Sequence, residues 1–388
     1  MKTRMFRSLV MTIGVGALGA GACGEQSPDP EPAACTPASG VICTIAGSGI
    51  AGDGADDQPA VKTKLYLPQD VTIAPDGRAF VVDWNNHRVR ALQPDGTLHI
   101  VAGIGELGLN SDDPSTNRLN HPTGAAFDQD GHLVIAAWHN SRIKVVDLAT
   151  GDLTDTCGNG MRAFAGDGGP AAAAALNLPV SVVFDKDWNM IIGDQANQRV
   201  RKVDHASGII STIAGTDDCV DPMDCDIGDG GPATAAHFAF PPGQAARPGG
   251  RVTVDPAGNL YVADTAHYRV RKIDTAGIIT TVAGTGLPGT AGDGGPATAA
   301  QLSRITDVAV SPDGNLYIAD TENNCIRVVD AEGTISTAVG KCGTQGFAGD
   351  GKPVAEALLN RPYGLDFDPQ GNLYIADTHN NRIRVLYK

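Results

Sequence analysis

Short apolar runs alternate with turn signals along most of the chain, and four such runs make one unit. The runs at 70–74, 260–263, 269–273 and 278–284 illustrate the first to the fourth of a unit. They are rich in β-branched residues and are separated by Asp-Gly or similar turns, such as the one at 75–77. Turn signals at this spacing between β-branched runs predict antiparallel four-stranded sheets.

The unit recurs six times, and its marker is Asp-x-x-Asn-x-Arg-Ile/Val-Arg/Lys, with drift. Successive markers start 54, 57, 70, 56 and 57 residues apart. Self-similarity at a nearly fixed period indicates a repeat architecture. Six four-stranded sheets around one axis make an all-β, six-bladed β-propeller, which leaves only short, protected edges. The markers start at Asp83, Ala137, Asp194, Asp264, Asp320 and Asp377.

The two ends of the repeat region complement each other. The last unit stops after its third strand, at 382–386, and a segment with the pattern of the missing fourth strand stands at 41–47, ahead of the first full unit. Pairing the two segments would close the ring with one strand from each end. Closure removes an open sheet edge, so we predict that an amino-terminal strand pairs with the last blade.

The fullest copies of the unit lie at 292–302 with 314–327, and at 349–362 with 371–384. With small drift they read Gly-Asp-Gly-Gly-Pro-Ala-x-x-Ala-x-Leu, then Gly-Asn-Leu-Tyr-Ile-Ala-Asp-Thr-x-Asn-Asn-Arg-Ile-Arg. This pattern resembles the repeats of bacterial NHL-repeat proteins and covers about residues 40–388. The resemblance implies a six-bladed propeller that binds a ligand, but it does not name the ligand, because one fold hosts many functions.

The marker Asp and the first marker Arg flank one tight turn, so a charge-assisted hydrogen bond between them is geometrically easy. We predict that these pairs staple their own hairpins, because a residue present in every repeat is usually needed by the repeat. In the fifth unit Cys325 replaces the Arg, so Asp320 is expected to lack its partner. The predicted pairs are Asp83/Arg88, Asp194/Arg199, Asp264/Arg269 and Asp377/Arg382.

The Gly-Asp-Gly-Gly-Pro-Ala segments are Gly-rich but lack the Lys-Ser/Thr of a phosphate loop. We expect them to carry the chain from the outer strand of one blade to the inner strand of the next. Calcium at Asp167, Asp229 or Asp293 is the weaker alternative, since the carboxylate spacing of a known calcium loop is missing. No other cofactor is expected.

The amino terminus has the pattern of an export signal over residues 1–22. A basic start precedes an apolar run that is too short and too Gly-rich to span a bilayer. The run ends in Ala-Gly-Ala before Cys23, which fits ordinary signal-peptidase cleavage and also resembles a bacterial lipobox. We favour the lipoprotein, because a Cys directly after the site needs a reason. Residues 23–39 read as a Pro/Ser-rich tether to a propeller at 40–388.

Eight Cys in an exported chain predict disulfides. The net charge of −15 would repel nucleic acid phosphates and anionic membrane surfaces. We therefore expect no nucleic acid partner, membrane contact only through a lipid anchor, and an outer-membrane, periplasmic or extracellular monomer. The expected pairs are Cys219–Cys225, Cys325–Cys342 and, with less sequence support, Cys35–Cys43, which leaves Cys157 as a small buried residue.

Three departures from the repeat mark the candidate binding site. Trp84 and Trp138 follow the marker position in adjacent blades, the second marker has Ala137 and His139, and the connection at 216–250 is long. The family resemblance implies that all three lie on one face. Two exposed Trp beside a disulfide-braced loop would suit a peptide, a glycan or another protein. The alternative is that the two Trp only cover the seam between blades 1 and 2.

These observations favour a non-enzymatic binding or scaffold protein of the cell envelope. No His-x-His, His-Glu-x-x-His or Gly-x-Ser-x-Gly occurs. The rival is a metal-dependent hydrolase or lyase of the gluconolactonase or amidating-lyase type, which needs acids, Asn or His converging on the central channel. The inner-strand ends offer Asp70 and Asp307 without a distinctive set. Trp188 lies in a turn of the opposite face and is set aside.

Overall fold

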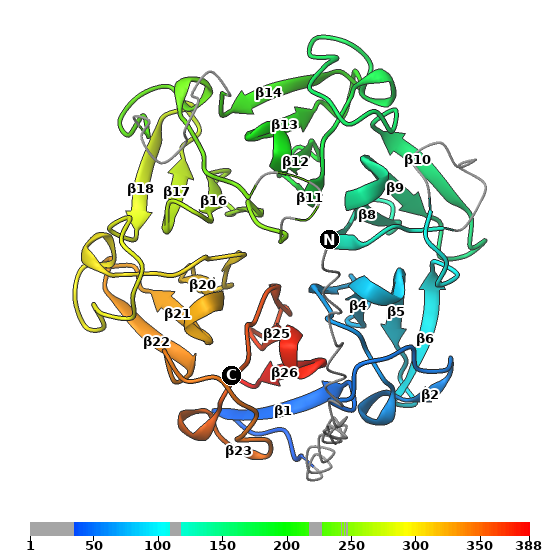
Figure 1. The fold of residues 1–388 in the computed structure, drawn as a ribbon, viewed down its shortest axis with the longest axis vertical. Helices are drawn as coiled ribbons and strands as arrows, with labels where there is room; N and C mark the ends of the chain where they lie inside the picture. The colour runs from blue at the N-terminus through cyan, green and yellow to red at the C-terminus, as the bar shows by residue number, and fades with distance from the viewer. Residues whose placement is uncertain (1–34, 109–117, 217–226, 242, 244, 246) are drawn as a thin grey trace, which may run out of the picture.

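The computed structural model describes residues 35–108, 118–216, 227–241, 243, 245 and 247–388. They form six antiparallel sheets around one axis (Figure 1), which confirms the all-β six-bladed propeller. The export signal, Cys23, the tether up to residue 34, and both Cys219 and Cys225 lie outside the described residues. No helix in the described part of the chain is long and apolar enough to cross a membrane.

Each blade has four strands that step outward from the axis. The first strands are β3 (Asp70–Ile73), β7 (Pro122–Phe127), β11 (Pro179–Phe184), β15 (Val252–Val254), β19 (Val308–Val310) and β24 (Leu365–Phe367). The second strands are β4 (Ala79–Asp83), β8 (Leu133–Ala137), β12 (Met190–Asp194), β16 (Leu260–Asp264), β20 (Leu316–Asp320) and β25 (Leu373–Asp377). The third strands are β5 (Arg88–Leu92), β9 (Arg142–Val146), β13 (Arg199–Val203), β17 (Arg269–Ile273), β21 (Cys325–Val329) and β26 (Arg382–Leu386). The outer strands are β6 (Thr97–Ala102), β10 (Leu153–Cys157), β14 (Ile210–Ala214), β18 (Ile279–Ala283), β22 (Ile335–Gly340) and β1 (Val41–Ala46).

The ring closes as the sequence predicts. Strand β1 pairs antiparallel with β26, with Ile42 opposite Leu386 and Thr44 opposite Arg384. Figure 1 shows β1 in blue beside β26 in red. The first described strand therefore completes the last blade by covering the outer edge of β26.

Single turns of 3-10 helix join the second strands to the third in five of the blades. They are η2 (Trp84–Asn86), η3 (Trp138–Asn140), η5 (Gln195–Asn197), η9 (Thr321–Asn323) and η11 (Thr378–Asn380). Because the strands are antiparallel, these turns and the segments entering the first strands lie at one end of the axis, which we call the motif-turn face. The turns after the first and third strands lie at the other end, the hairpin face.

The Gly-Asp-Gly-Gly-Pro segments carry the chain from blade to blade, as predicted, and they also cover the outer edge of the blade they enter. Strand β2 (Gln58–Pro59) pairs with β6, and β23 (Lys352–Pro353) pairs with β1. Similar single bridges join Pro170 to Ile209 and Pro296 to Thr334. These segments end in the 3-10 turns η1 (Ala60–Lys62), η4 (Ala171–Ala173), η7 (Ala233–Ala235), η8 (Ala297–Ala299) and η10 (Val354–Glu356).

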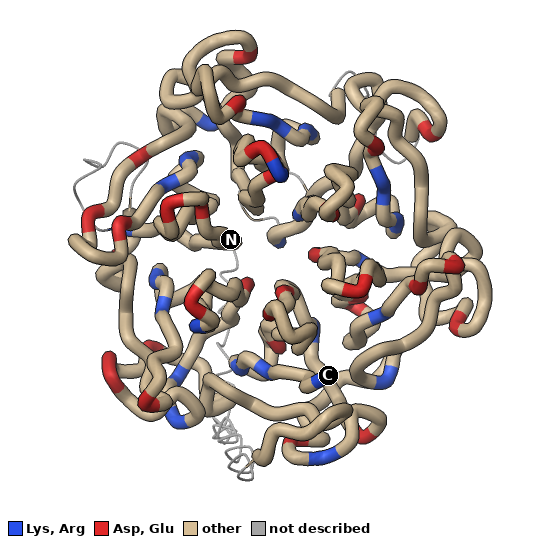
Figure 2. The backbone as a smooth tube through the Cα atoms, turned by 180° about the vertical axis from the view of Figure 1, so that it is seen from behind, with Lys and Arg blue, Asp and Glu red and all other residues tan. Residues whose placement is uncertain are grey.

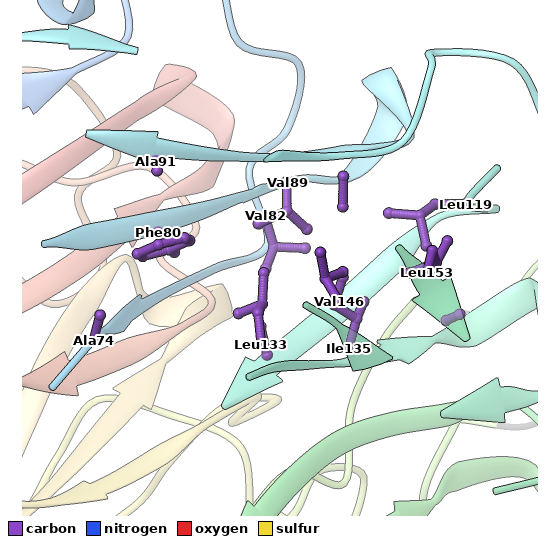
Figure 3. Close-up of a cluster of buried hydrophobic side chains, with 13 residues drawn as sticks. Ala74, Phe80, Val82, Val89, Ala91, Leu119, Leu133, Ile135, Val146 and Leu153 are labelled. Atoms are coloured by element: carbon purple, nitrogen blue, oxygen red, sulfur yellow. The ribbon is translucent and has the colours of Figure 1, made fainter. Parts of the chain in front are cut away.

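The buried apolar side chains gather between neighbouring blades. Phe80 and Val82 of blade 1 pack with Leu133, Ile135 and Val146 of blade 2 (Figure 3). Comparable clusters occupy the other seams, including the one between blades 6 and 1. Since each blade buries its two faces against two neighbours, the blades stabilise one another around the ring.

Candidate functional site

The marker Asp lies in the interior of its blade. The Asp194 carboxylate accepts hydrogen bonds from the Asn177 backbone N–H (2.8 Å) and Asn197 Nδ2 (2.7 Å), and it pairs with Arg201 Nη1 at 3.1 Å. Arg201 also binds Asp167 of the Gly-Asp-Gly segment at 2.5 Å. We call this arrangement, a buried Arg between a marker Asp and a segment Asp, the clamp.

The clamp corrects the predicted pairing of each marker Asp with the first Arg. The Asp binds the second Arg, which lies two residues further along the third strand on the same face of the sheet and reaches the carboxylate as its diagonal neighbour. Beside the second Arg, the outer strand carries a β-bulge that shifts its pairing with the third strand. Asp320 therefore has a partner after all. Figure 2 shows basic and acidic positions recurring from blade to blade. The clamps are Asp83–Arg90–Asp53, Asp194–Arg201–Asp167, Asp264–Arg271–Asp229, Asp320–Arg327–Asp293 and Asp377–Arg384–Asp350.

The first Arg of the marker turns to the loop beyond the outer strand. Arg88 donates to the Ile104 carbonyl (3.0 Å), and Arg269 donates to the Thr285 carbonyl (2.8 Å). The segment carboxylates Asp167, Asp229 and Asp293 are each bound to a guanidinium. These carboxylates do not fit the calcium alternative, because calcium needs several oxygen ligands that are not already taken by a cation.

The cysteines follow the sequence prediction where they are described. Disulfides join Cys35 to Cys43 and Cys325 to Cys342. Cys157 is free and buried, and burial raises the pKa of its thiol to about 12. A thiol of this kind is inert, so Cys157 acts as a small core residue.

A single guanidinium closes the centre of the ring. Arg251, at the start of the first strand of blade 4, pairs with Asp70 of blade 1 (2.8 Å) and Asp307 of blade 5 (3.4 Å). It also donates to the backbone carbonyls of Gln69 (2.9 Å) and Thr123. The sequence analysis named both carboxylates as candidates but missed Arg251, which stands at the equivalent position of its own repeat.

Beyond Arg251, the channel opens toward the hairpin face as a cavity of about 290 Å³. Asp366 lines it and accepts hydrogen bonds from the Ile73 backbone N–H (2.8 Å) and the Thr72 hydroxyl (3.3 Å). Burial, with a smaller contribution from the Asp70 charge, raises the pKa of Asp366 to about 7. Burial also raises the pKa of Asp70 and of Asp307, and Arg251 opposes the shift.

The channel residues do not fit the metal site of the enzyme alternative. Asp70 and Asp307 already bind a guanidinium, and no His is among the described residues that line the channel. The possible metal-binding groups found in the described chain lie elsewhere, and one of them contains the Cys325–Cys342 disulfide. We derive no catalytic step from this site.

On the motif-turn face, the seam between blades 1 and 2 holds an aromatic and imidazole cluster. Trp84 lies 6.4 Å from Trp138 and 4.7 Å from His121 between ring centroids, and Trp138 stacks on His139 at 4.2 Å. His87 packs edge-on against His121 at 4.4 Å. The structure therefore brings together all three predicted site residues and adds two histidines.

The expectation of two exposed Trp is wrong for Trp138, which is 1% exposed. Its ring packs on Leu178 and Val180 of blade 3, and its Nε1 donates to Gln195 Oε1 (3.1 Å). Trp84 is half-buried. The seam-covering alternative thus holds for Trp138, although the seam it fills is the one between blades 2 and 3.

At the equivalent seams between other blades, a small side chain makes the contact. The Thr321 hydroxyl donates to the Pro362 carbonyl, and the Thr378 hydroxyl donates to the Pro68 carbonyl, both at 2.7 Å. Trp84 and Trp138 stand at the equivalent positions. Their rings take the place of this hydrogen bond, which explains why Trp138 points between blades and not to solvent.

Two histidines of the cluster, His87 and His121, are neutral at physiological pH. Burial, followed by the nearby His87 and His139, lowers the pKa of His121 to about 3. Burial and Arg88 lower the pKa of His87. His139 Nδ1 lies 3.1 Å from His121 Nδ1, so one of the two nitrogens donates to the other. The cluster therefore offers aromatic surface and neutral polar edges.

A second cluster on the same face is cationic. Glu322 accepts hydrogen bonds from Arg247 (2.6 Å) and Arg361 (2.8 Å), and Arg304 lies 4.0 Å from it. The Arg side chains are 47%, 28% and 34% exposed, respectively. Burial, Arg361 and Arg247 lower the pKa of His379 to about 4. We call Arg247, Arg304 and Arg361 with Glu322 the arginine cluster.

Sequence reasoning missed the arginine cluster, although a signal was present. Arg304 and Arg361 occupy the repeat position that enters a first strand with positive φ, where blades 1 and 3 carry Leu67 and Leu178. His121 occupies that position in blade 2. Aligning this position across the repeats would have shown a ring whose chemistry changes from blade to blade.

Comparison with known proteins supports the resemblance of the repeats to NHL repeats. The family model described as the teneurin NHL domain matches residues 39–227, and the NHL repeat model matches 302–329 and 359–386. Teneurin-3 of Mus musculus is 30% identical over 357 residues, which is 84% of this chain and 12% of that protein. Teneurin-4 of Homo sapiens is 31% identical over 360 residues, again 84% and 12%. The chain therefore spans about one eighth of the length of these curated relatives.

Solved structures share the fold at low sequence identity. A structural genomics protein of unknown function from Bacteroides thetaiotaomicron has a TM-score of 0.64 and 19% identity, over 89% of this chain and 74% of that chain. An auxiliary nutrient binding protein from Bacteroides ovatus has a TM-score of 0.61 and 14% identity, over 89% and 76%. The repeats, the closed ring and the family matches together show that this chain is an NHL-repeat β-propeller.

Proposed function

We propose that this chain is an exported, non-enzymatic binding protein of the cell envelope, and that its motif-turn face binds an acidic segment of a protein or peptide, or an acidic glycan. The observation that carries the proposal is the arginine cluster. Three partly exposed guanidinium groups surround one carboxylate on a chain whose net charge is −15. A local positive patch attracts the anionic groups of a partner at short range, even on a protein whose net charge is negative.

The neighbouring aromatic and imidazole cluster supports the same face. Trp84 is half-buried, and His121 and His139 are partly exposed beside it. Aromatic and Arg side chains are the residue types that contribute most to protein interfaces. The face thus offers apolar contact on blades 1 and 2 and anion recognition on blades 5 and 6.

Export rests on separate support. The two disulfides favour an oxidising compartment, and the nutrient-binding protein that shares the fold supports a binding role. Lipid attachment at Cys23 remains part of the proposal. Mass spectrometry of the mature amino terminus tests it, since an unmodified Cys23 or a different first residue contradicts the anchor.

The binding proposal is tested by selecting peptides from a random dodecapeptide display library. We expect the selected peptides to be rich in Asp and Glu and to bind more weakly as salt rises, because screening weakens exposed charge pairs. The double variant Arg304→Ala/Arg361→Ala should lose about tenfold in affinity, which corresponds to about 1.4 kcal/mol.

Arg78→Ala is the matched control, since Arg78 is an ion-paired, partly exposed Arg in a turn of the hairpin face. It should bind the selected peptides as the wild type does. Peptides without acidic residues, or equal binding by the double variant and the wild type, would contradict the use of the arginine cluster.

A further inference from the structure

One turn of the hairpin face places a tryptophan where the other repeats place glycine. Trp188 has φ 61° in the turn between β11 and β12. The equivalent residues of the other five blades are Gly with φ between 81° and 89° (Gly77, Gly131, Gly258, Gly314 and Gly371). A bulky side chain with positive φ is a genuine outlier, because its Cβ crowds the backbone.

Unfavourable backbone conformations of this kind persist where function maintains them, and they gather at binding sites. Glycine is available at this position at no steric cost, as the other five turns show. Trp188 is also 40% exposed, so burial of its ring offsets only part of the free-energy cost of the positive φ. A role in stabilising the fold therefore explains the tryptophan at this position poorly, and contact with a ligand explains it better.

The ring of Trp188 borders a groove between blades 2 and 3. The groove has a volume of about 430 Å³, and Phe184, Met190 and Val203 contribute apolar side chains to its wall. Phe184 lies 6.0 Å from Trp188 between ring centroids. The same Trp also borders the mouth of the central channel, so it separates two openings of the hairpin face.

Polar side chains complete the groove. Gln129 Nε2 of blade 2 lies 3.2 Å from His205 Nε2 of blade 3, so the two side chains meet across the seam. Asp128, which pairs with His132, and Asp204, whose Oδ1 accepts hydrogen bonds from Ser207, also line the groove. The groove therefore has an apolar wall with an aromatic ring and an edge of hydrogen-bond acceptors and donors.

From this geometry we propose that Trp188 and the groove between blades 2 and 3 form a binding site for a neutral saccharide. A pyranose ring has an apolar C–H face and a polar hydroxyl edge. The C–H face packs on the electron-rich face of an indole, while the hydroxyl groups donate to the carboxylates and exchange hydrogen bonds with Gln129 and His205. The carboxylates disfavour an anionic ligand. The site is separate from the motif-turn face and does not depend on the arginine cluster.

The test titrates the whole protein with three neutral trisaccharides, cellotriose, maltotriose and N,N′,N″-triacetylchitotriose, by calorimetry and by tryptophan fluorescence. At least one trisaccharide should bind and change the emission, since Trp188 is more exposed than Trp84 and Trp138. Trp188→Gly should reduce the affinity at least tenfold while the melting temperature stays the same or rises, because glycine suits the positive φ. His205→Ala should weaken binding about threefold or more without unfolding the protein.

Tyr66→Ala is the matched control, because Tyr66 is an aromatic residue of similar exposure (39%) that does not line this groove. It should bind the trisaccharide unchanged, as should Arg304→Ala/Arg361→Ala, so failure here is distinguishable from failure of the peptide proposal. The proposal is overturned if no trisaccharide binds the wild type at 10 mM, if Trp188→Gly binds equally well, or if Trp188→Gly lowers the melting temperature, which would make Trp188 a packing residue.

Discussion

The blades and the axis both bury a guanidinium between two carboxylates, but they recruit the partners differently. Arg201 takes both carboxylates from its own blade, one from the neighbouring strand and one from the segment that enters the blade. Arg251 of blade 4 takes Asp70 from blade 1 and Asp307 from blade 5. The first arrangement recurs in five blades, whereas the second occurs once on the axis.

This difference predicts that the clamps stabilise single blades, whereas Arg251 stabilises the whole ring. A clamp fixes the hairpin, the bulge and the entering segment of a single blade, so its loss should act mainly there. Arg251 and its partners connect three blades across the centre, so its loss should weaken the whole ring. Because the clamp recurs in the repeats, its charged residues indicate a structural role and give no information on ligand binding.

The largest effect is expected at the axis. Arg251→Leu removes the cation between two buried carboxylates, and breaking a buried ion pair typically costs 3–5 kcal/mol; we expect about 4–5 kcal/mol at pH 8. A carboxyl whose pKa is higher in the folded state adds stability below its unfolded pKa of about 3.9 and loses it as pH rises through the folded pKa. The loss should therefore be smaller at pH 5. Urea unfolding at the two pH values measures it.

A control separates charge from shape at the same position. Adding Asp70→Asn and Asp307→Asn to Arg251→Leu should recover stability at pH 8, since no unpaired charge stays buried. An equal loss at pH 5 and pH 8, with no recovery in the triple variant, would mean that the guanidinium acts only by filling space.

Within a blade the expected effect is smaller. Asp194→Ala leaves Arg201 with the partly exposed Asp167 as its remaining carboxylate and removes the acceptor of the Asn177 backbone N–H. We expect a loss of about 3 kcal/mol, with faster hydrogen exchange confined to blade 3. The double variant Asp194→Ala/Arg201→Leu should lose less than the sum of the two single changes. Full additivity would show that the two side chains are not coupled.

The sequence predicts the fold because the propeller repeats itself. Six markers set the number of blades, and the offset between 41–47 and 382–386 sets the closure, since a missing strand must be supplied from somewhere. The described disulfides were also predictable, because Cys35 and Cys43 are only 8 residues apart and Cys325 and Cys342 stand at the two ends of one predicted hairpin.

The contacts within the fold were less predictable. Spacing alone suggested that Asp83 pairs with Arg88, which stands opposite it, but the diagonal neighbour Arg90 binds the carboxylate and Arg88 turns to the Ile104 carbonyl. One sequence does not show which of two Arg side chains on the same face of a strand reaches the carboxylate. Arg251 takes the repeat position that carries Asp70 in blade 1 and Asp307 in blade 5, so only an alignment of this position across the repeats shows opposite charges meeting on the axis. Trp138 looked like an exposed anchor, because sequence gives side-chain type but not the seam that the side chain fills.

Blade 2 offers the finest test of the comparison, because it has no marker Asp. Ala137 stands in its place, and Lys144 replaces the second Arg. Asp155 of the outer strand compensates by pairing with Lys144 Nζ (2.7 Å) and Arg142 Nε (2.9 Å). This carboxylate lies nearer the solvent than Asp194 does, and a lysine cannot make the two-pronged contact of an arginine.

We therefore expect Asp155→Ala to cost about 1 kcal/mol, between the values for exposed and buried ionic contacts. Urea unfolding beside Asp194→Ala provides the comparison, because both changes remove one carboxylate from a single blade. A loss equal to that of Asp194→Ala would show that blade 2 holds an equivalent clamp built from the outer strand. A clearly smaller loss would show that blade 2 depends more on the packing of Trp138 and the apolar seams, and that the clamp stabilises only the blades that keep it.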